Sequence, residues 1–359
     1  MLEDLVDVRK PNEKSLVFIL LLVGLVVGGS AGWAADAAPT AGPQQQSAVD
    51  EFGVSLSDTP PPTPPGFASQ DEAMKAVLAN RVKVFLPQAP IALPEGVVET
   101  KDVEYGKVGD RKLLLDLYMP AKLDKPAPGL IFIHGGGWKG GNRADYKYYT
   151  VRYAKRDYVC ATISYRFSQE APFPAAVQDA KCAVRWMRAN AAKYHVDPDR
   201  IAVLGGSAGG YLAMMVGYTS DVPELEGDGG YPEVSSKVRA VVNLYGPCDL
   251  DCPQARNVDV VRSFIGKPYD EARELYEKAS PVRYLTRDDP PTLILHGTVD
   301  ATVSIEQSDR LTAKLKEVGV PCQYEKFEGW PHTMDVAIDV NLRCQWFMNR
   351  FFRQYLSGK

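Results

Sequence analysis

The segment around Ser207 constrains the fold of this chain more than any other. Ser207 stands between Gly205 and Gly209. The apolar residues 201–204 come directly before this segment, and the helix-compatible residues 211–216 come directly after it. This order predicts a buried strand, a sharp turn that carries the serine, and a helix whose N-terminus points at it. Glycines are expected on both sides because side chains there would collide with neighbouring elements around a strained serine.

Short β-branched runs alternate with helical patterns through most of the chain. Two runs flank a turn at residues 108–111 and predict an antiparallel hairpin. With six further runs, the expected strands are residues 99–105, 113–118, 129–133, 159–165, 201–204, 238–244, 292–295 and 323–327. Apolar side chains recur at helical spacing within residues 174–194. The pattern predicts an α/β fold, with a mostly parallel central sheet, an antiparallel edge hairpin and helices on both faces.

The length of 359 residues suits one large domain with an N-terminal extension. We predict the catalytic domain at residues 97–359. Residues 69–96 predict a helical extension, in which Ser69 is the N-cap and Glu72 follows three residues later. Residues 35–68 are rich in Ala, Pro and Gln and have too few apolar side chains to form a core, so they predict a linker.

Residues 1–34 predict an export signal or a membrane anchor. Basic residues precede the apolar residues 15–29, and small residues follow them. This pattern predicts a signal peptide cleaved after Ala34; the alternative is an uncleaved anchor, which would be the protein's only contact with a membrane. No Lys or Arg follows the apolar stretch before Lys75, so either interpretation predicts a translocated catalytic domain. The expected location is periplasmic or extracellular, or on a membrane through the anchor.

Charge and cysteine content narrow the classes of partner and cofactor. The net charge is −4 and no stripe of Lys or Arg is present in the sequence, which argues against a nucleic-acid partner. Six cysteines are compatible with disulfides in an exported protein, and Cys248 and Cys252 are close enough in sequence to close a small loop. Cys160, inside a β-rich run, fits a buried thiol that packs as a small apolar side chain. The sequence has no Cys-x-x-Cys pair or histidine cluster that indicates a metal.

A glycine-rich loop follows the strand expected at residues 129–133. Residues 134–138 read His-Gly-Gly-Gly-Trp. An enzyme that transfers acyl groups must stabilise negative charge on a carbonyl oxygen, and consecutive glycines let backbone N–H groups approach that oxygen closely. We expect an oxyanion hole made by the amides of Gly136, Gly137 and Ala208. The alternative is a plain glycine-rich turn.

Ser207 becomes a strong nucleophile only if an imidazole takes its proton and a carboxylate orients that imidazole. The chain has four histidines. His134 belongs to the glycine loop, His195 to the end of a predicted helix and His296 to the end of a predicted strand. His332 lies in a loop after the last predicted strand and is therefore the expected base, with a structural histidine as the alternative.

Asp300 is the expected acid. It follows the strand at residues 292–295, at the carboxyl end where open α/β sheets place their sites. Asp288 and Asp289 precede that strand and so lie at its wrong end, and Asp335 is expected to be a solvated or capping carboxylate. A turn residue is the alternative role for Asp300. The chain order of serine, aspartate and histidine matches the order known for one hydrolase fold.

These elements resemble the α/β-hydrolase family, over residues 97–356. Within that family the chain is similar to the esterase and lipase branch with a His-Gly-Gly-Gly-Trp loop, which includes the feruloyl and acetylxylan esterases that act on carbohydrates. Further similar strings are residues 164–166, 197–201, 245–250, 279–281 and 290–297. One departure is the Trp-Pro pair before His332, where the family more often has glycine or alanine.

The resemblance implies a serine carboxylesterase that works through an acyl-enzyme without a metal or organic cofactor. The implied substrate is a small-molecule or polysaccharide ester, such as an acetyl or feruloyl ester. Arg166 and Asp249 are expected to position loops. Trp138 and residues 146–149 are expected to line the pocket or to pack against the sheet, and residues 221–236 stand where a short cap would be.

Two other functions are open at this point. An amide-cleaving relative, either an arylformamidase or a peptidase of the prolyl-oligopeptidase type, shares the same geometry of serine, histidine and acid. A binding protein on a hydrolase scaffold is the non-enzymatic alternative, and such proteins typically lack one of the three residues.

Overall fold

The structure is a computed structural model and describes residues 48–85 and 91–358. The strands are β1 (Val97–Val108), β2 (Arg111–Pro120), β3 (Ala127–Ile133), β4 (Val159–Ile163), β5 (Val196–Gly206), β6 (Ala240–Leu244), β7 (Thr292–Gly297) and β8 (Cys322–Phe327). The α-helices are α2 (Gln70–Leu78), α3 (Lys147–Lys155), α4 (Ala175–Ala189), α5 (Ala191–Tyr194), α6 (Ala208–Tyr218), α7 (Pro253–Arg256), α8 (Asp259–Ile265), α9 (Arg273–Lys278), α10 (Glu306–Val318) and α11 (Ile338–Leu356).

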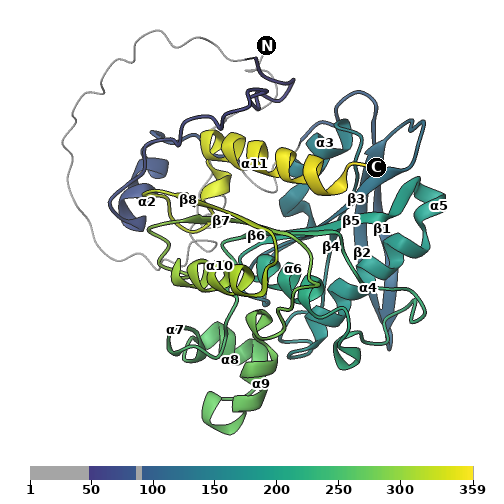
Figure 1. Ribbon diagram of the computed structural model, residues 1–359, viewed down its shortest axis with the longest axis vertical. Helices are drawn as coiled ribbons and strands as arrows, with labels where there is room; N and C mark the ends of the chain where they lie inside the picture. Colours follow the sequence, from purple (N-terminus) through teal and green to yellow (C-terminus); the bar gives the residue numbers. More distant parts are fainter. Residues whose placement is uncertain (1–47, 86–90, 359) are drawn as a thin grey trace.

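All eight predicted strands lie in one sheet, in the order β1-β2-β4-β3-β5-β6-β7-β8. β2 pairs antiparallel with both β1 and β4. From β4 to β8 in that order, neighbouring strands pair parallel. The predicted α/β fold, with a mostly parallel sheet and an antiparallel hairpin at one edge, is therefore confirmed (Figure 1).

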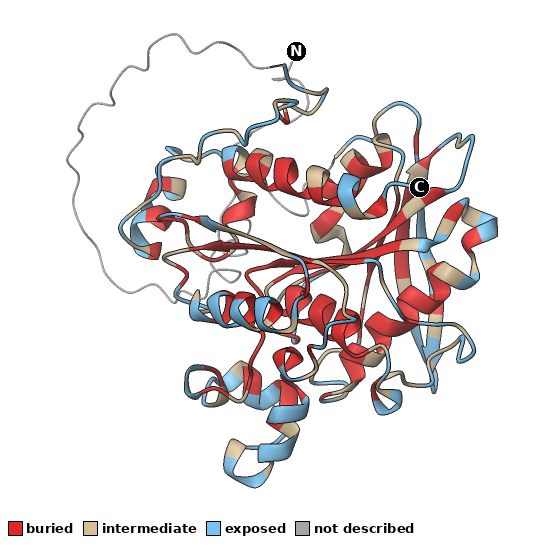
Figure 2. Ribbon diagram, in the orientation of Figure 1, coloured by how far each residue is buried: buried red, intermediate tan, exposed pale blue. Residues whose placement is uncertain are grey.

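Helices cover both faces of the sheet, as the apolar strands predict. In β3, Leu130 and Phe132 belong to the apolar cluster that contains α3 and α11, whereas Ile131 and Ile133 belong to the cluster that contains α4, α6 and α10. Successive side chains of a strand point to opposite faces, so each face has its own core. Figure 1 shows α11 on one side of the sheet and α6 and α10 on the other, and Figure 2 shows these helices buried where they face it.

The helix predicted at residues 174–194 is two helices, α4 and α5. Asn190 separates them, and its side-chain amide donates to the Trp186 carbonyl at 2.9 Å. Asparagine interrupts helices in this way because its side chain competes for backbone groups. The side chains predicted to face the core are all buried: Val177, Ala180, Val184, Met187 and Ala191.

The predicted linker is attached to the domain in its described part. Residues 48–69, which we call the N-terminal strap, run along α11 (Figure 1). Trp346 of α11 donates its Nε1–H to the Ser57 carbonyl at 3.0 Å, and Val54 is only 1% exposed. Extended, proline-rich backbone makes no hydrogen bonds of its own, so donors on the domain bind its carbonyls. The linker interpretation is therefore wrong for the described part of residues 35–68.

The strap ends at Ser69, which caps α2 as predicted. The Ser69 hydroxyl accepts the Glu72 N–H at 3.2 Å. The helix ends at Leu78, earlier than the predicted end near Phe85. The chain then forms a short extended stretch, in which Val84 pairs with Ala337. The described part of the extension therefore contributes one helix and an antiparallel bridge to the segment that follows β8.

The predicted signal or anchor at residues 1–34 lies outside the described residues. The first part of the predicted linker lies outside them as well. In the part of the chain that the structure describes, no helix combines the length and apolar character needed to cross a membrane.

The six cysteines carry free thiols, so the structure does not contain the disulfides that an exported protein could form. Cys248 donates its Sγ–H to the Gln307 carbonyl at 3.0 Å, and Cys252 donates to the Asp249 carbonyl at 3.3 Å. Each thiol of this pair has its own backbone acceptor. Cys160 is fully buried between strand neighbours, which confirms its predicted role as a small apolar side chain.

Candidate active site

Ser207 occupies the turn between β5 and α6, as predicted. Its φ of 56° and ψ of −123° lie in a region that residues other than glycine rarely adopt. Such strain costs roughly 1–3 kcal/mol and persists only where the surroundings enforce it. Here a Cβ atom at Gly205 would lie 2.4 Å from the Ile133 carbonyl oxygen, and one at Gly209 would lie 1.9 Å from it. Both glycines therefore permit the close approach of the turn to β3.

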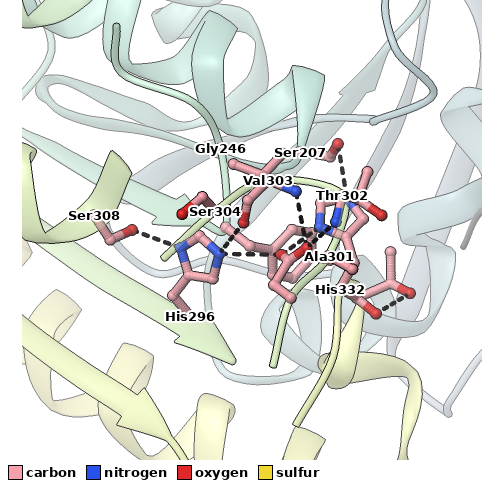
Figure 3. A network of polar contacts seen from close by, with 12 residues as sticks. Ser207, Gly246, His296, Ala301, Thr302, Val303, Ser304, Ser308 and His332 are labelled. Carbon is pink, nitrogen blue, oxygen red and sulfur yellow. Dashed lines mark hydrogen bonds and ion pairs between the residues drawn. The ribbon is translucent and has the colours of Figure 1, made fainter. Parts of the chain in front are cut away.

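Ser207, His332 and Asp300 form one chain of hydrogen bonds. Ser207 Oγ–H donates to His332 Nε2 at 2.9 Å, and His332 Nδ1–H donates to Asp300 Oδ2 at 2.6 Å (Figure 3). The three residues follow β5, β8 and β7, and the carboxyl ends of these parallel strands meet at one edge of the sheet. The structure thus brings together the three residues that the sequence nominated.

Four donors hold the Asp300 carboxylate. The backbone N–H groups of Thr302 and Val303 each donate to Oδ1 at 2.8 Å, and His296 Nε2–H donates to Oδ2 at 3.0 Å, the same oxygen that accepts from His332. Burial by itself would raise the pKa of Asp300, but the two imidazoles and their hydrogen bonds outweigh it and hold the pKa below its ordinary value. Asp300 therefore stays ionised and orients the imidazole of His332.

His296 is a part of this network that the sequence did not reveal. The sequence places it at the end of a strand, where a histidine is most often structural. In the structure His296 is fully buried, and its Nδ1 accepts the Ser308 hydroxyl proton at 2.7 Å (Figure 3). This bond leaves the His296 proton on Nε2, directed at Asp300. One signal for this role was present in the sequence: His296 stands four residues before Asp300, at the carboxyl end of the strand that Asp300 follows.

The glycine loop lies beside Ser207. A Cβ atom at Gly135 would lie 3.3 Å from the Ser207 Cβ. Gly136 and Gly137 have φ angles of 106° and 59°, which favour glycine. With Ala208, the first residue of α6, they line the same cavity as Ser207. The structure thus places all three predicted donors of an oxyanion hole at the cavity that contains the serine.

His134 holds the glycine loop in shape. Its Nδ1–H donates to the Gly135 carbonyl at 2.8 Å, and its own carbonyl accepts from the Tyr165 hydroxyl at 3.0 Å. Burial lowers the pKa of His134 to about 4, so the ring is neutral at neutral pH. A neutral ring stacked on Tyr165 at 4.5 Å fits a structural role.

A cavity of about 630 Å³ opens at Ser207. One group of lining side chains is apolar and comes from the glycine loop and the α7–α8 region: Trp138, Leu250, Ala255, Val258, Val260 and Val261. A second group is aromatic and acidic: Phe85, Tyr146, Tyr149, Tyr245 and Asp335. The expectation that Trp138 and residues 146–149 line the pocket is confirmed for Trp138, Tyr146 and Tyr149.

The predicted cap is in a different place. Residues 221–236 contribute no side chain to this cavity in the described chain; α7 and α8 do so instead. Within residues 221–236, Glu226 forms ion pairs with Lys181 and Arg185 of α4 at 2.7 and 2.6 Å. These bonds hold the segment against a helix on the face of the sheet, away from its carboxyl edge. The cap prediction is therefore wrong, because partners on α4 decide where the loop packs.

Asp335 is buried, contrary to the expectation of a solvated or capping carboxylate. It is 3% exposed and accepts hydrogen bonds from the Tyr149 hydroxyl, at 2.8 Å, and from the Tyr245 hydroxyl. Burial raises the pKa of Asp335, and the two tyrosines offset this only in part. The Tyr245 ring also contacts His332, with 4.8 Å between the ring centres. A second carboxyl group thus lies near the base without touching it.

Arg166 and Asp249, the two residues expected to position loops, each form an ion pair. Arg166 donates from Nη2 to Asp179 Oδ1 at 2.8 Å, and Arg310 forms an ion pair with Asp249. Among the described residues, no group of three or more His, Cys, Asp or Glu side chains is arranged to hold a metal ion.

Comparisons with known sequences point to esterases. A family model described as BD-FAE matches residues 115–315. Esterase LipC of Mycobacterium tuberculosis (strain ATCC 25618 / H37Rv) is 37% identical over 229 residues, which are 62% of this chain and 56% of LipC. Esterase LipQ of the same strain is 30% identical over 303 residues, which are 82% of this chain and 70% of LipQ. The chain thus spans little more than half of LipC.

Solved structures agree. A truncated form of a carbohydrate esterase from gut microbiota superposes with a TM-score of 0.65 at 28% identity and covers 73% of this chain and 97% of its own. A thermophilic esterase from the Planctomycetes species Thermogutta terrifontis, with propionate bound, superposes with a TM-score of 0.62 at 28% identity and covers 74% of this chain and 98% of its own. The chain therefore has the fold of these esterases.

Proposed function

Because the chain belongs to the BD-FAE family, within the esterase branch of the α/β-hydrolases, we propose that it is a serine hydrolase of carboxylic esters. The observation that carries this proposal is the continuous hydrogen-bond chain from Ser207 through His332 to Asp300, beside a loop of glycine amides. A nucleophile, a base and an acid in this order are the components needed for acyl transfer.

In the proposed acylation step, Ser207 Oγ attacks the ester carbonyl carbon while His332 Nε2 takes the serine proton. The imidazolium that forms is stabilised by Asp300, which is already ionised. The negative charge that develops on the carbonyl oxygen is stabilised by the amides of Gly136, Gly137 and Ala208, each such donor contributing roughly 10²- to 10³-fold in rate. His332 then gives its proton to the departing alkoxide, and the alcohol leaves.

The proposed deacylation step uses the same groups. Water replaces the alcohol, His332 takes a proton from it, and the resulting hydroxide attacks the acyl-enzyme carbonyl. The same amides stabilise the second oxyanion. When this intermediate collapses, Ser207 Oγ leaves, takes the proton back from His332, and the carboxylic acid is released.

The proposed substrates are acetyl or feruloyl esters of polysaccharides. The apolar side chains near α7 and α8 suit an acyl group, and the tyrosines and Asp335 offer hydrogen-bonding groups to a hydroxylated alcohol. The likeness to a carbohydrate esterase from gut microbiota supports the same class of substrate.

A substrate panel tests this proposal. We expect turnover of nitrophenyl acetate and of acetylated xylan or feruloylated sugars, and covalent labelling by a fluorophosphonate that is lost in Ser207→Ala. Faster turnover of a peptide anilide or an N-formyl aromatic amine would show that the protein is an amide-cleaving enzyme and not an esterase. Labelling that persists in Ser207→Ala would show that another residue is the nucleophile.

We also propose that the protein is exported, on the strength of the apolar segment at residues 15–29 and the small residues after it. Cell fractionation and N-terminal sequencing of the exported form test this proposal. A mature N-terminus at Ala35 is the expected result; a catalytic domain that remains in the cytoplasm would contradict it.

A further inference from the structure

The N-terminal strap touches the loop that carries His332. The Phe67 N–H donates to the Gly329 carbonyl at 2.7 Å, and Trp330 Nε1–H donates to the Pro64 carbonyl at 3.0 Å. The rings of Phe67 and Trp330 meet edge to face, with 5.5 Å between their centres. Trp330 is only 5% exposed and stands two residues before His332. The strap therefore covers the start of the loop that positions the base.

The approach is close enough to require glycine on both sides. A Cβ atom at Gly66 would lie 2.1 Å from the Glu328 carbonyl oxygen. One at Gly329, where φ is 70°, would lie 2.5 Å from the Phe67 nitrogen. Backbone packed against backbone at this distance leaves the loop no room to move toward the strap.

The helix that follows the strap touches the loop that carries Asp300. Gln70, the first residue of α2, is buried, and its Oε1 accepts the Ala301 N–H at 3.1 Å. Ala301 is the residue directly after Asp300. The strap and the start of α2 thus contact both the loop of the acid and the loop of the base.

Hydrogen bonds also join these two loops to each other. The Gly329 N–H donates to Thr298 Oγ1 at 2.8 Å, and the Val299 N–H donates to the Trp330 carbonyl at 3.2 Å. With the contacts of Pro64, Phe67 and Gln70, these bonds connect the strap, the start of α2 and the two loops that carry Asp300 and His332.

We infer that the strap and Gln70 position the acid and the base of the active site, and that Trp330 and Gln70 are positioning residues for the reaction proposed above, on which this inference rests. Asp300 and His332 are joined by one hydrogen bond of 2.6 Å. Small displacements of reacting groups lower rates steeply, so an element that holds both loops acts on turnover and not only on stability.

The chain offers a matched pair of variants to test this. Trp330 and Trp346 each donate an indole N–H to a strap carbonyl at 3.0 Å, but Trp346 lies on α11 and binds Ser57, near the middle of the strap, instead of the part that contacts the catalytic loops. Trp330→Phe and Trp346→Phe each remove one such bond and keep an aromatic ring. Both variants should lower Tm, Trp346→Phe by the smaller amount, because the Ser57 carbonyl keeps a hydrogen bond from Arg350 at 2.8 Å.

Activity is expected to separate the two variants. In Trp330→Phe, kcat on nitrophenyl acetate should fall about tenfold with KM unchanged, and fluorophosphonate labelling of Ser207 should slow by a similar factor. In Trp346→Phe, kcat and the labelling rate should equal those of the wild type. Gln70→Ala, which leaves Trp330 intact, should reproduce the loss of kcat and provides the test if Trp330→Phe does not fold.

Two results would overturn the inference. Equal kcat in the two tryptophan variants, with Gln70→Ala at the wild-type rate, would mean that the strap contributes stability alone. A change confined to KM would mean that the strap shapes the cavity and does not position the acid and base. A wild-type protein that neither hydrolyses esters nor reacts with the fluorophosphonate would instead overturn the proposed function, and this inference with it.

Discussion

Asp300 and Asp335 are two buried carboxyl groups near the same histidine, and their surroundings have opposite effects on them. Asp300 accepts from two imidazoles and two backbone amides, which lower its pKa despite burial. Asp335 accepts from two tyrosine hydroxyls, and burial raises its pKa. Burial alone therefore does not mark a catalytic acid; a carboxylate that must balance a positive imidazole needs donors that favour its charge.

The largest expected effect comes from removing the charge of Asp300. Asp300→Asn should lower kcat by roughly 10³- to 10⁴-fold, because an amide at this position no longer selects the required tautomer of His332 or stabilises its positive charge. Asp335→Asn is the matched control and should stay within about threefold of the wild type on nitrophenyl acetate, since Asp335 does not contact His332 and this substrate lacks the sugar hydroxyls proposed to reach Asp335. Steady-state kinetics on nitrophenyl acetate distinguish the two, and equal losses in both variants would contradict the comparison.

A smaller effect is expected from His296, which donates to the same oxygen of Asp300 as His332. His296→Ala should lower kcat about tenfold, because a hydrogen bond to a charged group contributes about 1.5 kcal/mol or more. Ser308→Ala removes the hydroxyl that orients His296 and should have a weaker effect of the same kind. If His296→Ala lowered Tm but left kcat unchanged, His296 would support the fold and not the acid.

The pH dependence of stability should differ in sign between the two carboxyl groups. The pKa of Asp335 in the folded state is above its ordinary 3.8, so its contribution to stability is present below that pH and is lost as the pH rises through the folded pKa. The pKa of Asp300 is below 3.8, so its contribution is present above that pH and is lost as the pH falls.

Thermal unfolding from about pH 2 to about pH 8 measures this difference, because the contribution of Asp300 changes below pH 3.8 and that of Asp335 changes above it. The difference in stability between Asp335→Asn and the wild type should shift in favour of the variant as the pH rises above 3.8. The difference between Asp300→Asn and the wild type should be largest at neutral pH, where the variant is the less stable, and should shrink as the pH falls below 3.8. Parallel curves for the two variants would show that the two sites do not differ as described.

The smallest effect on activity is expected from the tyrosines. Tyr245→Phe keeps the ring against His332, so kcat should change by less than about twofold. The variant removes a donor to Asp335, so the free energy of unfolding should fall by about 1–3 kcal/mol. Tyr149→Phe removes the donor to the other oxygen of Asp335 and should destabilise the fold to a similar extent. A large loss of kcat in Tyr245→Phe but not in Tyr149→Phe would show that the Tyr245 hydroxyl takes part in catalysis.

Local patterns predicted most of the fold and the central residues of the candidate site. Eight strands, the hairpin at one edge, the serine turn and the glycine loop were readable because each depends on spacing and residue type within a few positions. Asp300 and His332 were readable because parallel strands end at one edge of the sheet, so the residues after those strands meet there.

The remaining features depend on contacts between distant segments. The position of residues 221–236 depends on Lys181 and Arg185, and the course of the strap depends on donors from α11 and the His332 loop. The pKa of Asp335 depends on its burial and on two tyrosines far away in sequence. The pattern of residues along the sequence does not predict which distant group will donate a hydrogen bond to a proline carbonyl or to a buried carboxyl group.

The sequence by itself determined the kind of fold and which side chains stand at the ends of its strands, because the spacing of apolar residues indicates which faces of each strand and helix are buried away from water. The tertiary structure alone decided which of two nearby carboxyl groups has a lowered pKa and which a raised one, which helices line the cavity and what holds the catalytic loops. These outcomes depend on the donors and charges that folding brings within a few ångströms, and those come from every part of the chain.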